Sequence, residues 1–283
     1  MNSVISRRIA LFAVIAGCLA ASNAVAGPKV TVGRNVPANQ LVTMDRIDHS
    51  AWDSLLKRYV DTKGNVNYTA WLNSPADVRA LDGYLNSLSQ ADPRQRASKA
   101  ATLAFWINAY NAVTIKGILR EYPTTSIRNH TARLYGYNIW KDLLLVVGGY
   151  SYALEQIENE VLRKMGDPRI HFAIVCASHS CPRLLNEAYT ADRFDEQITV
   201  NTRNFFANPE NFRYTNGMFY LSSILKWYAG DFGSASAQQL QTIAPYLPDR
   251  AAQQAAAQGA GRISYLSYDW SLNDQKTART ARR

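Results

Sequence analysis

The feature that most constrains the fold is a change in the spacing of apolar residues along the chain. In the first half, apolar residues recur at helical intervals, which predicts helices from Ser50, over 75–88 and over about 97–121. In the second half, short apolar runs flank two-residue turns rich in glycine, which predicts β-hairpins at 143–153 and 212–221. This mixture indicates an α+β fold rather than a doubly wound sheet.

No linker rich in Gly, Ser or Pro divides the chain after its first residues, so we expect a single α+β domain over 48–274. The expected architecture is a mixed or antiparallel sheet of about five to six strands with helices packed on it. A leader strap precedes the domain at 27–47, and a basic tail follows it at 275–283. The remaining expected elements are helices over about 154–165, over 191–207 and within 235–258, and strands at 170–177 and 262–270.

The composition suits a globular protein. Of 283 residues 47% are apolar and 19% are charged, which suffices for a packed core and excludes a disordered chain. Three cysteines without a CxxC pair exclude a disulfide scaffold and a zinc ribbon. Phosphate-binding glycine loops, HExxH and clustered aspartates are absent, so we expect no cofactor and no metal.

The N-terminus has the layout of a secretory signal peptide over residues 1–26. Arg7 and Arg8 precede the apolar run 9–17, and small residues end at Ala26. Two alternatives remain open: a lipoprotein signal that would anchor the protein through Cys18, and a retained anchor helix. Removal of a signal peptide would leave no transmembrane span, and we expect a periplasmic or secreted protein.

The charge predicts little about partners. The net charge is +9, and two of the positive charges, Arg7 and Arg8, lie in the predicted signal peptide. The other positive residues are scattered along the chain except in the tail. We therefore expect no nucleic-acid partner. A peptide or a component of the cell envelope is the expected substrate, and the oligomeric state is open.

One segment, 167–182 (DPRIHFAIVCASHSCP), holds two of the four histidines and both cysteines outside the predicted signal peptide. In a flat strand, His171 and Cys176 would point to opposite faces, so they can meet only if the chain bulges or turns between them. Cys181 precedes Pro182, a favoured first helical residue, and would then be a helix N-cap whose thiol pKa is lowered. Three roles stay open for the cysteines: a disulfide, buried apolar residues, or a nucleophile with His171 or His179 as its base.

Three other segments carry polar residues with candidate roles. Asn108 and Asn111 lie on one face of an apolar helix, where they would brace a neighbouring loop or supply an amide to the site. Glu155 and Glu158 begin a helix, where the dipole alone favours carboxylates, although one could orient His171. Asp269 lies among aromatic residues near the C-terminus.

Taken together, these segments resemble one bacterial and plant family, domain of unknown function 547. The resemblance rests on FWINAYNA, the hairpin-to-helix stretch, DPRIHFAIVCASHSCP, SSILKWYAGDF and YLSYDWSLND, and it spans about 48–274. It implies export and a fold similar to papain and transglutaminase thiol enzymes, in direct or permuted chain order. It also aligns Cys176 and His171 with the family's first cysteine and strand histidine. Asn159 and Lys226 depart from the family, where a histidine and an acidic residue are common.

The sequence thus predicts a thiol-dependent hydrolase or acyl transferase acting on an amide or ester bond. In this hypothesis Cys176 attacks, His171 moves the proton, Glu158 orients His171 and Asn108 supports the site. Cys181 is the alternative nucleophile or a disulfide partner. The rival hypothesis is a non-catalytic cell-envelope module that binds peptide or glycan, and a weaker third is a redox protein.

Overall fold

The computed structural model describes residues 29–130 and 137–280. The predicted signal peptide and Cys18 lie outside these residues. The helices are α1 (Ser50–Tyr59), α2 (Tyr68–Leu72), α3 (Pro75–Leu88), α4 (Lys99–Glu121), α5 (Ile139–Asp142), α6 (Leu154–Gln156), α7 (Phe194–Ala207), α8 (Ser223–Trp227), α9 (Ala229–Phe232), α10 (Ser236–Ile243), α11 (Arg250–Ala257) and α12 (Gln275–Thr280). The strands are β1 (Val30–Val32), β2 (Leu143–Val147), β3 (Tyr150–Ala153), β4 (Phe212–Thr215), β5 (Met218–Leu221) and β6 (Arg262–Tyr265).

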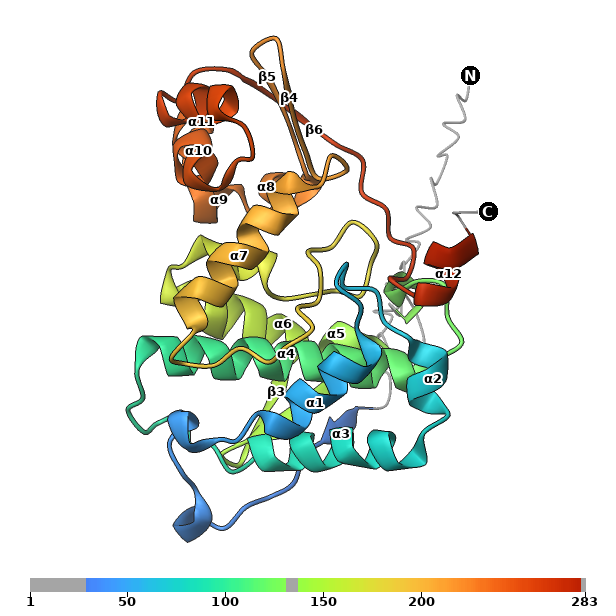
Figure 1. Cartoon of the computed structure of the whole chain (residues 1–283). Helices are drawn as coiled ribbons and strands as arrows, with labels where there is room; N and C mark the ends of the chain where they lie inside the picture. Colours follow the sequence, from blue (N-terminus) through green and yellow to red (C-terminus); the bar gives the residue numbers. More distant parts are fainter. Residues whose placement is uncertain (1–28, 131–136, 281–283) are drawn as a thin grey trace, which may run out of the picture.

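The three helices predicted in the first half are confirmed, and capping side chains explain where α3 and α4 begin. The Ser74 side chain accepts the Asp77 N–H at the start of α3, and Pro75 occupies the first helical position. Ser98 caps α4 in the same way. Most side chains of α4 are buried, and this helix crosses the lower part of the molecule (Figure 1).

The two predicted hairpins are also confirmed. Gly148 and Gly149 have φ of 58° and 85°, and Asn216 and Gly217 have φ of 51° and 72°. Two consecutive residues with positive φ match the right-handed twist of paired strands, which is why these dipeptides favour hairpins.

The prediction of one sheet with five to six strands is wrong, because the strands form two small mixed sheets of three. Each hairpin gains a parallel third strand from a distant part of the chain: β1 pairs with β2, and β6 pairs with β5. β1 is only three residues long and lies within the predicted leader strap, where no apolar alternation indicated a strand. An α+β fold nevertheless remains the description of the chain.

The strand predicted at 170–177 does not form. Pro168–Phe172 is a 3-10 helix, and irregular backbone follows it. Buried amide side chains take the hydrogen bonds that a neighbouring strand would have supplied. Asn111 donates to the Ala173 carbonyl (3.0 Å) and accepts from the Val175 N–H (2.9 Å), while Asn201 donates to the Phe172 carbonyl (2.7 Å).

The helix predicted at 154–165 extends over those residues in three forms. α6 is followed by a π-helical turn, Ile157–Leu162, and by a 3-10 turn, Arg163–Met165. Gly166, with φ of 72°, ends it in the left-handed conformation. Single π turns inside helices often accompany functional sites, and this one carries Glu158.

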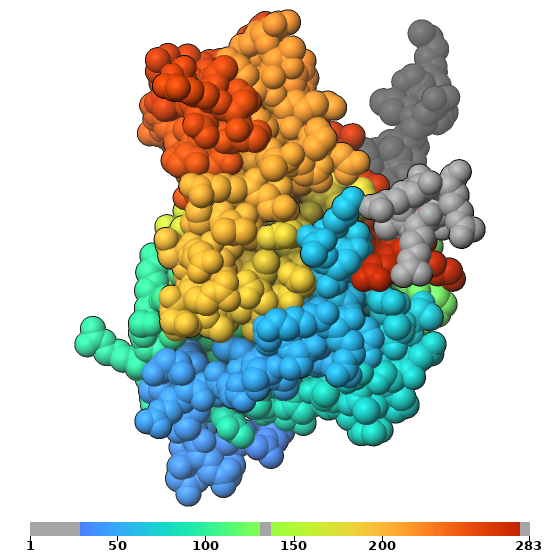
Figure 2. Space-filling model, in the orientation of Figure 1, coloured from blue at the N-terminus to red at the C-terminus, as the bar shows by residue number. Residues whose placement is uncertain are grey.

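Within the described ranges, buried apolar side chains form two clusters. The first surrounds α4 and includes residues of α1, α3 and β2, whereas the second includes residues of α7, α10, α11 and β5. In Figure 1 the second cluster's helices and sheet lie above α4, and the segment after β6 descends to α12 beside α2. Figure 2 shows the same division on the surface, with blue N-terminal residues below and orange and red C-terminal residues above. No helix in the described ranges combines the length and apolar character that a membrane span requires.

Candidate functional site

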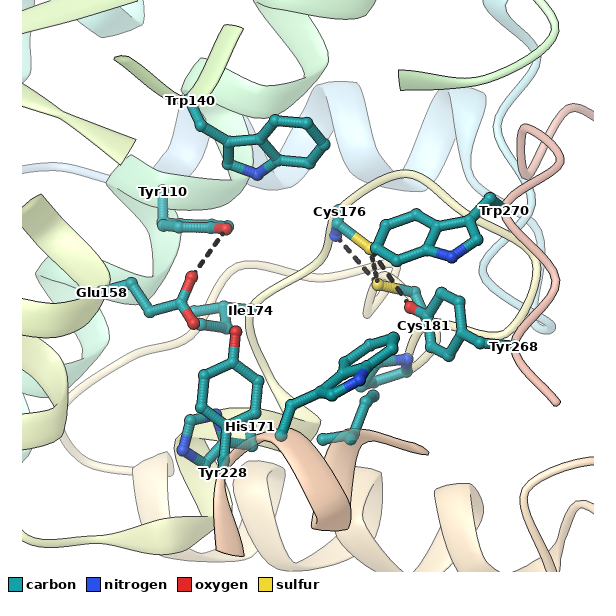
Figure 3. A pocket seen from close by; sticks show the side chains of 13 residues that line it. Tyr110, Trp140, Glu158, His171, Ile174, Cys176, Cys181, Tyr228, Tyr268 and Trp270 are labelled. Carbon is teal, nitrogen blue, oxygen red and sulfur yellow. Dashed lines mark hydrogen bonds between the residues drawn. The ribbon is translucent and has the colours of Figure 1, made fainter. Parts of the chain in front are cut away.

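A cavity of about 160 Å³ lies where side chains from residues 110–182 meet α8 and the segment after β6 (Figure 3). This volume resembles that of protein cavities that accept a benzene-sized group. Aromatic rings and both described cysteines line it, together with one carboxylate and one histidine. The lining residues are Tyr110, Trp140, Glu158, His171, Ile174, Cys176, Cys181, Pro182, Ile224, Trp227, Tyr228, Tyr268 and Trp270.

Both cysteines in this cavity are free thiols whose sulfur atoms lie 2.6 Å apart. The Cys176 sulfur also lies 3.0 Å from the Ser178 hydroxyl and 3.2 Å from the Tyr268 hydroxyl. These two hydroxyls are 2.9 Å apart. Ala177 has φ of 54°, a left-handed conformation that few non-glycine residues adopt, and this local turn brings Cys181 back towards Cys176.

The two sulfurs differ in their hydrogen bonds and therefore in their acidity. Burial raises the pKa of the Cys181 thiol, but hydrogen bonds from Cys176 and Tyr268 outweigh this effect and lower it to about 7. One of these bonds comes from the backbone N–H of Cys176 at 2.9 Å. The hydrogen bond to Cys181 and burial together raise the pKa of Cys176 well above its usual value. The negative charge of the pair therefore resides on Cys181.

The reason we predicted for an acidic Cys181 is wrong. Residues 182–193 form no helix, so Cys181 is not a helix N-cap. Its charge is stabilised by neighbouring donors rather than by a helix dipole.

His171 lines the same cavity as the cysteines but does not contact them. Its Nε2 lies 2.7 Å from Asp231 Oδ2, and its ring stacks on Tyr228 with the centroids 4.0 Å apart. Burial lowers the His171 pKa in spite of the Asp231 carboxylate, so the ring is neutral at pH 7. In Figure 3 it lies beside Tyr228, across the cavity from Cys176 and Cys181. No hydrogen bond joins either sulfur to a histidine among the described residues, so the predicted Cys176–His171 contact is not formed.

Glu158 does not orient His171, and this prediction is wrong. Its Oε2 accepts the Tyr110 hydroxyl at 3.1 Å, and the Tyr228 hydroxyl also bonds to its carboxylate. Burial raises the Glu158 pKa, while the two tyrosine hydrogen bonds oppose this effect. Asp231 takes the orienting position instead.

Asp231 is in turn held by Arg163. The guanidinium donates from Nε (2.6 Å) and from Nη2 (2.9 Å) to the two carboxylate oxygens. Asn159 accepts a third hydrogen bond from Arg163 at 2.8 Å. Asn159, which departs from the resembled family, thus positions an arginine in this chain. We missed Asp231 although it lies within SSILKWYAGDF, because nothing in the local pattern paired it with a residue 60 positions earlier.

Of the two asparagines of α4, only Asn111 supports the cysteine segment, through Ala173 and Val175. Asn108, which we predicted to support the site, bonds the backbone N–H and carbonyl of Tyr189 and braces that loop. His179, considered above as a base, is exposed and lies 3.1 Å from Glu210.

Three aromatic rings form one wall of the cavity. Tyr268 lies 4.8 Å from Trp227 and 4.6 Å from Trp270 between ring centroids, and the two tryptophans are stacked at 5.6 Å. Trp227 is 48% exposed, so the wall reaches the surface. The sequence singled out Asp269 here, but it is Tyr268 that contacts the sulfurs; Asp269 accepts the Ser271 N–H. Lys226, the other departure from the family, lies over the Tyr265 ring.

No group of three or more His, Cys, Asp or Glu residues is arranged to hold a metal ion in the part of the chain that the structure describes.

Residues 94–206 match a family model described as "Protein of unknown function, DUF547". The matched segment contains Asn108, Glu158, His171 and both cysteines of the cavity but ends before Asp231 and Tyr268. No significant match was found among curated proteins or among solved structures. The predicted resemblance to the DUF547 family is thus confirmed over residues 94–206.

Proposed function

We propose that the cavity is the active site of a thiol enzyme that hydrolyses or transfers an acyl group, with Cys181 as its nucleophile. The observation that carries the proposal is the hydrogen bond from the Cys176 N–H to the Cys181 sulfur, in a cluster of donors that brings the Cys181 pKa to about 7. A thiol of this acidity is about half ionised at pH 7 and needs no histidine to remove its proton.

In the proposed reaction the Cys181 thiolate attacks the carbonyl carbon of an ester or amide. A carbon–sulfur bond forms, and the bond from that carbon to the leaving oxygen or nitrogen breaks. The leaving group takes a proton from the Tyr268 hydroxyl, which bonds to the sulfur pair. Although the Tyr268 pKa is raised, its phenolate is a far weaker base than an alkoxide or an amide anion, so this transfer is favourable.

The second half of the reaction releases the acyl group. Water, or another acceptor with an O–H or N–H group, attacks the thioester carbon and returns its proton to the Tyr268 phenolate. The carbon–sulfur bond breaks, and the Cys181 thiolate is restored. His171 acts in this proposal as a positioning residue, because its ring supports Tyr228 by stacking. A relationship to papain-like enzymes belongs to the same proposal and is supported by the family resemblance.

The proposal is tested with p-nitrophenyl acetate and reduced protein. We expect a burst of p-nitrophenol and an acetyl group on Cys181, identified by peptide mass spectrometry. Cys181→Ser should abolish the burst, whereas Cys176→Ser, which keeps the backbone N–H, should retain acylation at Cys181. An exposed serine variant, Ser50→Ala, is the matched control.

Acetylation of Cys176 alone, or an unchanged burst in Cys181→Ser, would show that the nucleophile is assigned wrongly. Saturable binding of envelope peptide or glycan without any acylation would favour the rival hypothesis of a binding module, which the aromatic wall of the cavity supports.

We also propose that the protein is exported, because residues 1–26 have the layout of a signal peptide. The mass of the protein purified from its native cell distinguishes the routes. Cleavage after Ala26 leaves an unmodified chain, cleavage before Cys18 leaves a lipidated one, and an intact N-terminus found in the cytoplasm contradicts export.

A further inference from the structure

We propose that the cavity binds a protonated amino group of its ligand, an alkylammonium held between aromatic rings and the Glu158 carboxylate. The corresponding substrate is an ester or amide that carries a cationic amine near its reactive carbonyl. This substrate class rests on the proposed function, whereas the binding of an ammonium group does not.

The charges of the cavity wall favour a cation. No lysine or arginine is present among the described residues that line it. His171 is neutral at pH 7 because burial lowers its pKa. The other ionisable groups of the wall are Glu158, the two thiols and the tyrosine hydroxyls, which are neutral or negative and never positive.

The Glu158 carboxylate has acceptor sites to spare. Its side chain is buried, with the residue only 7% exposed, and the hydroxyls of Tyr110 and Tyr228 are its protein donors. A carboxylate offers about four acceptor positions, so two hydroxyls leave room for N–H donors. An ammonium would also offset the cost of burying this charge, which an uncharged ligand could not do.

The nearest protein cation does not fill this role. Arg163 lowers the Glu158 pKa through its charge, but its Nε and Nη2 are directed to Asp231 and its Nη1 to Asn159. Its charge is therefore paired with Asp231 rather than with Glu158.

Most of the remaining lining residues are aromatic, and the faces of aromatic rings attract cations. Trp140, Trp227 and Trp270 line the cavity in addition to the tyrosines. The outer part of the same wall already holds a cation, because the Arg128 guanidinium lies over the Trp270 ring at 5.1 Å. A volume of about 160 Å³ accommodates a short alkylammonium chain but not a whole peptide.

The test uses the Cys181→Ser variant, which excludes covalent chemistry, and two probes of equal shape, n-pentylammonium and 1-pentanol. Calorimetry and tryptophan fluorescence measure their dissociation constants. We expect the ammonium to bind roughly tenfold more tightly than the alcohol, as charge-assisted and cation–π contacts predict. Glu158→Gln should remove this preference, and Glu158→Asp should retain part of it. Glu155→Gln, at a partly exposed glutamate in the preceding turn that pairs with Lys141, is the matched control.

Equal binding of the two probes, no binding of the ammonium, or an ammonium preference that persists in a folded Glu158→Gln variant would overturn the inference. Near-equal thermal stability of the variants establishes that they are folded. The result is independent of the proposed thiol chemistry. Ammonium binding without acylation would contradict only the proposed enzyme activity, and acylation without a preference for the ammonium would contradict only the proposed binding site.

Discussion

At the scale of single residues, the two cysteines show how position decides reactivity. They are identical side chains five residues apart, yet the backbone N–H of one donates to the sulfur of the other. The accepting sulfur is stabilised as a thiolate, and the pKa of its neighbour is raised. From the sequence we predicted Cys176 as the nucleophile and Cys181 as the alternative, whereas the two pKa shifts favour the reverse order, which depends in part on a hydroxyl from residue 268.

We expect iodoacetamide to modify Cys181 at least tenfold faster than Cys176 in the reduced protein. The rate should rise with pH around a midpoint near 7, because the thiolate reacts and the Cys181 pKa is about 7. Tyr268→Phe removes one donor and should move the midpoint upward. Peptide mass spectrometry after timed quenching measures both rates, and faster modification of Cys176 would contradict the assignment.

His49 should make the folded state sensitive to acid. Its Nδ1 lies 2.7 Å from the Tyr84 hydroxyl, and burial lowers its pKa from 6.5 to about 4. Between these values the unfolded chain takes up a proton that the folded one does not, so stability falls as pH decreases through this window. The loss is at most about 3 kcal/mol, at about 1.4 kcal/mol per pH unit.

Urea unfolding of the protein and of His49→Gln at several pH values between 4 and 7.5 measures this effect. The difference in unfolding free energy between the two should narrow towards pH 4, since glutamine keeps a hydrogen-bonding side chain without titrating. A difference that is constant over the whole range would rule out the linkage.

At the scale of elements, α4 holds the site by means of two buried amides that serve different loops. The sequence predicted α4 and placed Asn108 and Asn111 on one face, but it assigned the supporting role to Asn108. The three-residue offset is one helical turn, and only the packing decides which segment each amide meets.

Asn111→Leu should therefore disturb the cysteines, and Asn108→Leu should not. Each change leaves a buried N–H and carbonyl without partners, which costs about 2–4 kcal/mol. Both variants should lose similar stability in urea unfolding. Only Asn111→Leu should slow alkylation of Cys181, because residues 173–175 lead directly into Cys176; equal alkylation rates in the two variants would contradict this role.

At the scale of the whole molecule, Asp231 joins the two apolar clusters. It lies in α9 beside Phe232 of the second cluster. Its carboxylate bonds to Arg163, which follows Leu162 of the first cluster, and to His171, which lies between Ile170 of the first cluster and Phe172 of the second. Hydrogen bonds from Arg163 and His171 lower the Asp231 pKa, so this contribution to stability is present above pH 4 and is lost as pH falls further.

Asp231→Ala should lower the free energy of unfolding by about 1–3 kcal/mol, because a partly buried guanidinium and an imidazole lose their partner. It should also lower the His171 pKa further, which NMR titration of the imidazole detects. Glu196→Ala, which removes an exposed ion pair with Arg193, is the control and should cost less than about 0.5 kcal/mol. Equal losses in the two variants would show that Asp231 does not connect the clusters.

The sequence alone determined the α+β class, the long helices and the two hairpins, because capping side chains, helical spacing and turn dipeptides act within a few residues of the elements they specify. The tertiary structure decided how the strands divide into two sheets, since each third strand comes from a distant segment. It also decided that 170–177 is not a strand, since Asn111 and Asn201 satisfy its backbone. Asp231 beside His171, Tyr110 beside Glu158 and Tyr268 beside Cys176 are 60, 48 and 92 positions away along the chain, and only packing brings each pair together.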